Sequence, residues 1–259
     1  MAAAAAAAPI LKVEIGSFYI PKDNPSKPLG EDAHFVFSGK QVAGVADGVG
    51  GWASKGIDAG EYARDLMRNC IASVAGADGV VKPKRVMTEA HSRTTAAGSS
   101  TACLISFDGQ YLRAANLGDS GFMVFRGGKL FFRSTAQRRW FNCPYQMGTG
   151  ERCDKPETAA WSGKIQMAAG DIIVVGTDGL LDNVFAKEIV EVLAAEVAET
   201  AKDLAKLLAE LAWYNSLDVL KDGPFAVKAR KAGRSHRGGK IDDITVVVAK
   251  VTAASFSCS

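Results

Sequence analysis

The chain has 259 residues, of which 47% are hydrophobic and 23% are charged, so it can bury the core of one soluble domain. Its net charge of +3 is too small to indicate nucleic acid or an acidic membrane surface as a partner. The five cysteines form no C-x-x-C pair and are odd in number, which argues against a disulfide framework and against a thiolate zinc site.

The N-terminal segment, Met1 followed by seven alanines and Pro9, is of low complexity and too short to span a membrane as a helix. We therefore expect tails at 1–13 and 253–259 around one domain at 14–252, and no transmembrane segment. Residues 1–13 contain neither Arg nor Ser and do not resemble a transit peptide. The expectation is a soluble intracellular monomer, cytoplasmic or nuclear unless a longer targeting segment for the chloroplast or mitochondrion has been removed.

Short runs rich in β-branched and aromatic residues predict strands in both halves of the chain. The runs lie at 34–38, 41–46, 101–107, 111–116, 121–125, 129–132, 172–176 and 244–251. Asp108-Gly109 and Gly127-Gly128 are tight-turn pairs between neighbouring runs. The runs on either side of each pair should therefore form antiparallel hairpins.

Apolar residues at helical spacing predict helices in the gaps between these strands. The helices lie over 59–74, 86–97, 189–197 and 204–211. Thr200 and Asp203 resemble a capping box ahead of the last one. Hairpins, then paired helices, then more strands are typical of an α+β domain, so we predict a central antiparallel β-sandwich flanked by helix pairs. Two segments, 137–163 and 215–240, fall outside this pattern and are predicted to be long loops.

Acidic residues stand beside several of the predicted strands. Asp47 and Asp178 each follow an apolar run and precede a glycine, and Asp242 precedes the last run. Each of them alone is explained as a turn former. Together with Glu31 and Asp32 they supply the hard oxygen ligands that two Mg²⁺ or Mn²⁺ ions require. Gathering them in one cleft is unfavourable unless a cation neutralises them, so the residues predict a di-metal hydrolase.

Six motifs stand in the order that characterises the type 2C metal-dependent Ser/Thr protein phosphatases, which this chain resembles from about Gly30 to Val251. The motifs are Glu31-Asp32, Asp47-Gly48-x-Gly50-Gly51, Gly98-Ser99-Ser100-Thr101-Ala102, Leu117-Gly118-Asp119-Ser120, Thr177-Asp178-Gly179-Leu180-x-Asp182-Asn183 and Asp242-Asp243-Ile244-Thr245. Three further stretches, at 45–52, 134–146 and 238–243, are similar to the branch of small plant plastid and mitochondrial phosphatases.

The resemblance implies a β-sandwich flanked by helix pairs, with two Mn²⁺ or Mg²⁺ ions in a cleft at one end and a weaker third ion. The implied metal ligands are Glu31, Asp47, Gly48 through its backbone carbonyl, Asp119, Asp178, Asp242 and Asp243. Asp47 would bridge both ions, while Asp178 and Asp242 would hold one of them. Glu31 would reach the other ion through water, and Asp119, which alone would be read as a hairpin residue, would help to hold the third.

The chain departs from the wider family at several positions. Val49 stands where many members carry a His, so protonation of the leaving group must come from metal-bound water or another group. Lys27 replaces the usual phosphate-binding Arg and is a point charge without the bidentate fork of a guanidinium. Asp243 replaces the common Asn. The implied catalytic residues are Asp47, Asp178, Asp242 and Lys27, and the segment 137–163 would contain a flap beside the cleft.

The expected function is metal-dependent hydrolysis of phosphoserine and phosphothreonine in phosphoproteins. Water activated by the two ions would attack phosphorus directly, without a phosphoenzyme. Lys27 and Val49 motivate an alternative, a catalytically weak or silent pseudophosphatase that binds phosphoproteins. A carboxylate-metal nuclease is disfavoured because the chain lacks a basic, aromatic-bearing groove, so no nucleic-acid partner is expected.

Overall fold

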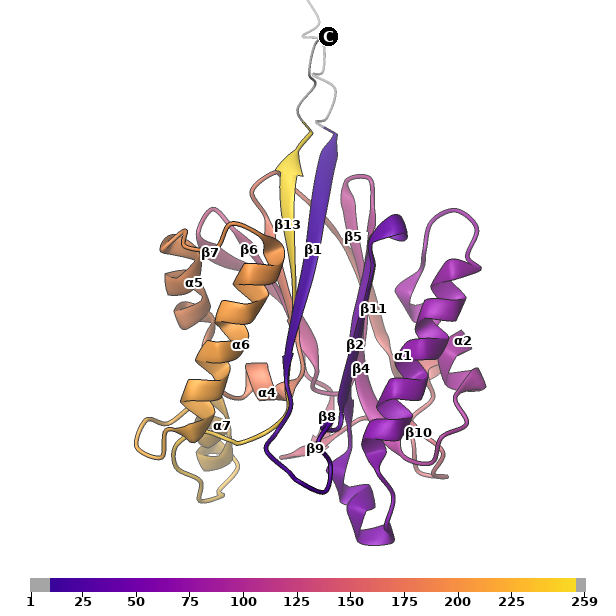
Figure 1. The fold of residues 1–259 in the computed structure, drawn as a ribbon, viewed down its shortest axis with the longest axis vertical. Helices are drawn as coiled ribbons and strands as arrows, with labels where there is room; N and C mark the ends of the chain where they lie inside the picture. Colours follow the sequence, from indigo (N-terminus) through magenta and orange to yellow (C-terminus); the bar gives the residue numbers. More distant parts are fainter. Residues whose placement is uncertain (1–9, 255–259) are drawn as a thin grey trace, which may run out of the picture.

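Two β-sheets of the protein stack face to face, and helices cover both outer faces (Figure 1). This computed structural model describes residues 10–254. The five-stranded sheet contains, in spatial order, β1 (Leu11–Ile20), β13 (Ile244–Ala253), β12 (Ile172–Gly176), β6 (Gly121–Arg126) and β7 (Lys129–Arg133). The six-stranded sheet contains β11 (Trp161–Gln166), β5 (Tyr111–Leu117), β4 (Ser99–Asp108), β3 (Val42–Gly48) and β2 (Asp32–Phe37), with β10 (Met147–Gly148) beside β4. Strands β8 (Arg138–Trp140) and β9 (Cys143–Pro144) form a separate ribbon.

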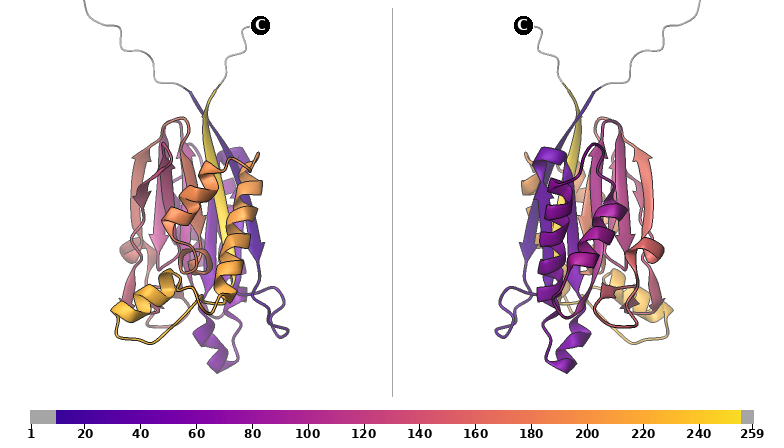
Figure 2. Two further views of the ribbon diagram at one scale, coloured as in Figure 1. Left: turned by 90° about the vertical axis from the view of Figure 1, so that its left-hand side faces the viewer. Right: turned by 90° about the vertical axis from the view of Figure 1, so that its right-hand side faces the viewer.

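Helix pairs form the two outer layers. The pair α1 (Ala59–Ala75) and α2 (Pro83–Arg93) packs on the six-stranded sheet, and the pair α5 (Ala186–Ala194) and α6 (Ala201–Leu217) packs on the five-stranded sheet. Figure 2 shows these two helical faces in turn. The shorter helices are η1 (Ser38–Lys40), η2 (Gly50–Lys55), α3 (Pro156–Ala159), α4 (Asp178–Leu181) and α7 (Pro224–Lys231). The predicted α+β fold, an antiparallel sandwich flanked by helix pairs, is confirmed.

Successive side chains of a strand point to opposite faces of its sheet, so each central strand contributes to two cores. In β3, Ala43 and Val45 contact the other sheet, whereas Val42 and Ala46 pack with residues of α1 and α2. Strand β13 divides its residues between the space between the sheets and α6 in the same way. Asp47 continues the alternation of Ala43 and Val45, and its side chain is therefore directed between the two sheets.

Each of the predicted strands is present, and the two predicted hairpins are the pairs β4–β5 and β6–β7. Strands β1 and β11, both at sheet edges, were not predicted. Strand β1 begins at Leu11 and pairs with β13 as far as Ala253, so the predicted tails 1–13 and 253–259 both extend too far into the domain. The short apolar alternation at the start of β1 closely follows the run of alanines, so it was not recognised as a strand. Residues 1–9 and 255–259 lie outside the described residues.

The two segments predicted as long loops contain regular structure. Segment 137–163 contains β8, β9, β10, α3 and the first residues of β11. Segment 215–240 contains α7, which begins at Pro224 and buries Phe225. Glycine and charged residues in both segments interrupt the periodic patterns by which short elements are recognised.

Two predicted helices end earlier than expected. Helix α2 ends at Arg93 and α5 ends at Ala194. Val197, which had extended the apolar pattern of α5, is 66% exposed and adds nothing to the core. The predicted capping box is confirmed, because the Asp203 amide donates to Thr200 Oγ1 and the Thr200 amide donates to Asp203 Oδ2, each at 3.1 Å. Between residues 10 and 254, the helices lack the length and apolar character that a membrane crossing requires.

Candidate metal centre

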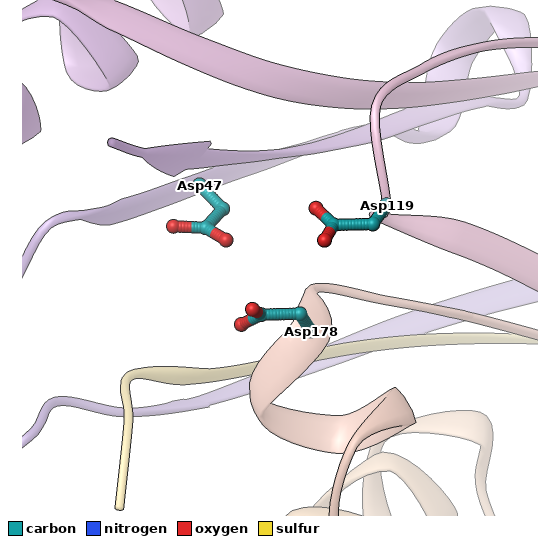
Figure 3. A group of neighbouring side chains, drawn as sticks. All are labelled: Asp47, Asp119 and Asp178. Carbon is teal, nitrogen blue, oxygen red and sulfur yellow. The ribbon is translucent and has the colours of Figure 1, made fainter. Parts of the chain in front are cut away.

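Asp47, Asp119 and Asp178 come from three separate elements and direct their carboxylates toward one another (Figure 3). Asp47 lies in β3, Asp119 in the turn between β5 and β6, and Asp178 at the first residue of α4. One carboxylate oxygen from each side chain lies within 4.8 Å of the other two. At this spacing a single hard cation can contact all three.

A cleft of about 430 Å³ contains these three aspartates. The other residues predicted as metal ligands, Glu31, Gly48, Asp242 and Asp243, line the same cleft. The structure therefore brings the whole predicted ligand set to one place, although its members are spread from residue 31 to residue 243. The metal-binding role of each residue stays a prediction.

Gly48 allows the end of β3 to pass close to two other segments. A Cβ atom at this position would lie 2.7 Å from the backbone of Ala59, at the start of α1, and 2.7 Å from the Glu31 carbonyl oxygen. The Gly48 amide donates to that same oxygen at 3.0 Å. Only glycine fits, and its small size allows this close approach at the cleft that Glu31 and Asp47 both line.

The turn that carries Asp119 is held by hydrogen bonds from the segment predicted to contain the flap. Gly118 has a φ of +102°, and its carbonyl oxygen accepts from the Gln137 amide at 2.8 Å. The hydroxyls of Thr101 and Ser120 hydrogen-bond at 2.7 Å and join the turn to β4. Arg138 Nε donates to Asp119 Oδ2 at 2.9 Å, which fixes the orientation of the carboxylate.

Lys240 also lines the cleft and joins two of the predicted ligands. Its ammonium is ion-paired with Asp178 Oδ2 and lies 2.9 Å from Asp242 Oδ2. Lys240 is not among the site residues predicted from the sequence. Its contacts with Asp178 cross 62 residues of sequence, so no local pattern could have found them.

Lys27, predicted to bind phosphate, lies next to Glu31 rather than free in the cleft. Its ammonium donates to Glu31 Oε1 at 2.6 Å and lies 3.9 Å from Asp58 Oδ1. Val49 lines the cleft at the position where a histidine would stand in many relatives. Its side chain has no proton to exchange, as the sequence indicated.

Asp243 is engaged mainly by the loop that precedes β2. Its Oδ1 accepts from the Tyr19 hydroxyl at 2.8 Å and from the Lys22 amide at 3.0 Å, and its Oδ2 accepts from the Glu31 amide at 3.1 Å. These contacts favour a positioning role for Asp243, which holds Glu31 in place, over direct contact with an ion.

Asp32 is a site residue whose position the sequence did not reveal. It pairs with Asp47 in the register of β2 and β3, and it is 3% exposed. Its Oδ2 accepts from the hydroxyls of Thr177, at 2.8 Å, and Thr245, at 2.7 Å. Thr245 belongs to β13 of the other sheet and Thr177 directly follows β12, so Asp32 connects the two halves of the sandwich next to Asp47.

Asp182 is a second carboxylate whose role was missed, although its motif was recognised. It is 1% exposed, and Lys228 Nζ donates to its Oδ1 at 2.6 Å. Arg138 and Lys240 approach it at 3.7 and 3.6 Å. Asp182 therefore lies behind the cleft, surrounded by the cations that also contact Asp119 and Asp178.

The cleft carries more negative charge than its cations neutralise. Burial, together with the charges of Asp178 and Asp32, raises the pKa of Asp47 well above its usual value. Burial likewise raises the pKa of Asp32, with a contribution from the charge of Asp243. Burial and the charge of Asp178 raise the pKa of Asp119 to about 6, although Arg138 opposes the change. These carboxylates are thus poised to gain either protons or metal.

The residues present fit a centre of hard divalent cations. Asp32 Oδ1 and Asp119 Oδ1 are buried and have no hydrogen-bond partner within residues 10–254. A buried carboxylate oxygen without a donor is costly, and a cation removes that cost. Carboxylate and carbonyl oxygens, without histidine or thiolate in the cleft lining, are the ligands preferred by Mg²⁺ and Mn²⁺.

The chain is similar to curated plant proteins over most of its length. A protein of Arabidopsis thaliana named probable protein phosphatase 2C 55 is 44% identical over 247 residues, which cover 94% of this chain and 53% of that protein. The chain therefore spans about half the length of this relative. No family model matches the chain.

Two solved structures show the same architecture. The photosystem II phosphatase PBCP has a TM-score of 0.87 at 34% identity, with 94% of this chain and 100% of that chain covered. The catalytic domain of the serine threonine protein phosphatase PstP, solved with two manganese ions, has a TM-score of 0.59 at 20% identity, with 94% and 99% covered. At that identity the second likeness concerns the fold alone.

Proposed function

The chain belongs to the protein phosphatase 2C family, and from this membership we propose that it hydrolyses phosphoserine and phosphothreonine in proteins with two Mn²⁺ or Mg²⁺ ions bound in the cleft. The observation that carries the proposal is the convergence of Asp47, Asp119 and Asp178, from three elements, to within 4.8 Å. Such a concentration of buried and half-buried carboxylates is unfavourable without a cation, so its presence is best explained by metal binding.

The cleft residues divide into those that would hold ions and those that position them. Asp47, Asp178 and Asp242 would hold the pair, with Glu31 and the Gly48 carbonyl completing it. Asp119 would serve the weaker third ion. Bound ions of this kind supply a nucleophilic water at neutral pH and neutralise charge on a transferring phosphoryl group. PstP, which shares the fold, was solved with two manganese ions.

The chain's own side chains would orient the phosphoprotein substrate. Lys27 and Lys22 place positive charge beside Glu31 and in the cleft lining, where a phosphate group would enter. Val49 provides an apolar wall and cannot protonate the leaving serine or threonine oxygen. That proton would come from water or from another group of the cleft.

A catalytically silent binding protein is not favoured by the site. Every carboxylate that the family motifs predict as a ligand lines the cleft, and several of them repel one another. A monomeric state and a location in chloroplast or mitochondrion remain predictions. The support for a plastid location is the similarity to a phosphatase of photosystem II.

The test is phosphate release from a phosphothreonine peptide by the purified protein with Mn²⁺ or Mg²⁺. We expect turnover that is abolished by EDTA, restored by metal, and lowered by several orders of magnitude in Asp178→Asn. Asp78→Asn, at an exposed carboxylate outside the cleft, serves as the matched control and should keep wild-type turnover. Normal hydrolysis by Asp178→Asn, or equal turnover in EDTA, contradicts the proposal.

A further inference from the structure

Lys240 occupies an unusual position among the carboxylates of the cleft. Its ammonium contacts Asp178 and Asp242, the two side chains expected to hold the same ion, and the side chain is only 17% exposed. A monovalent cation of the protein therefore lies where the carboxylates would share a divalent one. Two cations cannot keep the same carboxylate oxygens without strong repulsion.

The backbone of Lys240 is fixed, so only its side chain can move. The Lys240 amide donates to Asn183 Oδ1 at 2.8 Å, and its carbonyl oxygen accepts from Asn183 Nδ2 at 2.8 Å. Asn183 also donates to the carbonyl of Gly179 at 2.8 Å, so the Lys240 backbone is connected through Asn183 to α4. The four-carbon side chain can then turn at its end without any change of fold.

Asp182 offers the ammonium a second place. Its Oδ2 is buried and lacks a hydrogen-bond partner in the described part of the chain, and it lies 3.6 Å from Lys240 Nζ. A shift of about 1 Å would bring the two atoms to hydrogen-bonding distance. The other oxygen of Asp182 is already bound by Lys228, at 2.6 Å, so the carboxylate cannot rotate freely toward the metal ligands.

We propose that Lys240 is a built-in counter-cation that holds Asp178 and Asp242 together before metal binds, and that it moves to Asp182 Oδ2 when a divalent ion takes those two carboxylates. The inference rests on the proposed function, because it assumes that Asp178 and Asp242 are metal ligands. Lys240 is in this sense a positioning residue. It stabilises the metal-free cleft and weakens the affinity of the cleft for metal.

This role has a signature that other roles lack. Removing the ammonium should destabilise the metal-free protein, since the aspartates then repel one another, and should tighten metal binding, since a competing charge is gone. A lysine that only supports the fold would lower stability and metal affinity together. A lysine that only binds substrate phosphate would leave metal affinity unchanged.

The experiment compares Lys240→Met with wild type by calorimetric titration with Mn²⁺ and by thermal unfolding in EDTA. We expect the Mn²⁺ dissociation constant of Lys240→Met to fall about tenfold or more, while its melting temperature in EDTA falls by several degrees. Lys228→Met is the matched control, because Lys228 also binds Asp182 but has its ion pair on the other oxygen. It should lower stability without tightening Mn²⁺ binding. Equal or weaker Mn²⁺ binding by Lys240→Met overturns the inference.

A second variant tests the place to which the ammonium moves, and its Mn²⁺ affinity can be measured even if Lys240→Met does not fold. Asp182→Asn should weaken Mn²⁺ binding about tenfold, because the displaced ammonium loses its negatively charged acceptor. In the Lys240→Met background the same substitution should have little further effect. Undiminished Mn²⁺ affinity in Asp182→Asn overturns the proposed movement.

The outcomes also separate this inference from the proposed function. A wild-type protein that binds no Mn²⁺ and releases no phosphate contradicts both. A wild-type protein that binds Mn²⁺ and hydrolyses the phosphopeptide, with Lys240→Met unchanged in affinity, contradicts only the role of Lys240.

Discussion

Asp32 lies directly opposite Asp47 in the antiparallel pair of β2 and β3, and the two carboxylates share the face that looks toward the other sheet. Burial raises the pKa of both, and the charge of Asp32 adds to the rise at Asp47. Asp32, which lies next to the proposed metal ligand Asp47, is therefore itself costly to keep ionised. The metal-free protein should therefore be under electrostatic strain that metal relieves.

The metal-free protein should lose stability as the pH rises. The pKa of Asp119 is about 6 in the folded state and near 4 in an unfolded chain, so the folded state binds this proton more tightly. Its contribution is fully present below pH 4 and is lost as the pH passes 6, a change of about 3 kcal/mol in the free energy of unfolding. In urea unfolding with EDTA, the free energy of unfolding of Asp119→Asn minus that of wild type should increase by that amount between pH 4 and pH 7. A constant difference across this range contradicts the prediction.

Asp32→Asn should have opposite effects on stability and on metal binding. At pH 7.5 without metal it removes a buried charge while keeping an oxygen for Thr177 and Thr245, so the free energy of unfolding should rise by about 1–3 kcal/mol. Mn²⁺ affinity should fall about tenfold, as expected when the partner of a metal ligand is neutralised. Chemical unfolding in EDTA and Mn²⁺ titration measure the two effects. A loss of metal-free stability would count against this account of the cleft.

Arg138 and Arg139 are neighbours with different expected effects. Arg138 pairs with Asp119, which is buried, whereas Arg139 is 42% exposed and pairs with Asp154 near the surface. Arg138→Gln should cost about 3–5 kcal/mol at pH 7.5, because a buried carboxylate loses its cation. Arg139→Gln should cost less than about 1 kcal/mol. The two variants are compared by urea unfolding, and similar losses would show that Asp119 does not depend on Arg138.

Gly48→Ala should disrupt the cleft, whereas Gly51→Ala should not. A Cβ at Gly48 would lie 2.7 Å from the backbone of Ala59 and of Glu31, but one at Gly51 would meet no atom within 4 Å among the residues that the structure describes. Gly48→Ala should therefore cost about 2–4 kcal/mol and weaken Mn²⁺ binding, since β3 and the Glu31 loop must separate. Thermal unfolding and Mn²⁺ titration of both variants check this. Equal behaviour of the pair would contradict it.

The sequence predicted the carboxylates that line the cleft more completely than it predicted their surroundings. Asp47 and Asp178 end apolar runs and precede glycines, so their place at strand ends could be inferred from local pattern. The position of Asp32 was harder to infer, because it depends on the pairing of β2 with β3 and on hydrogen bonds from Thr245 in β13 and from Thr177 after β12. Lys240 and Asp182 could not be assigned at all, since their roles arise from contacts across the fold.

The same distinction explains the errors in the fold. Central strands such as β3 and β13 carry continuous apolar runs because both of their faces are covered, and these were found. Edge strands are covered less fully, and β11 has the burial pattern of a strand with much of its surface exposed. Its sequence therefore resembles a loop, and its position beside β5 became visible only from the pairing of Trp161 with Asn116.

The hydrogen bonds from Thr177 and Thr245 to Asp32 make the cleft a joint property of both sheets. Asp47 belongs to one sheet and Asp178 follows a strand of the other, so neither half of the sandwich holds the complete set of proposed ligands. An ion bound as proposed would be captured only after the two halves have docked in register. Loading with metal would then report the completion of folding, and the proposed activity would wait until strand β13 is in place.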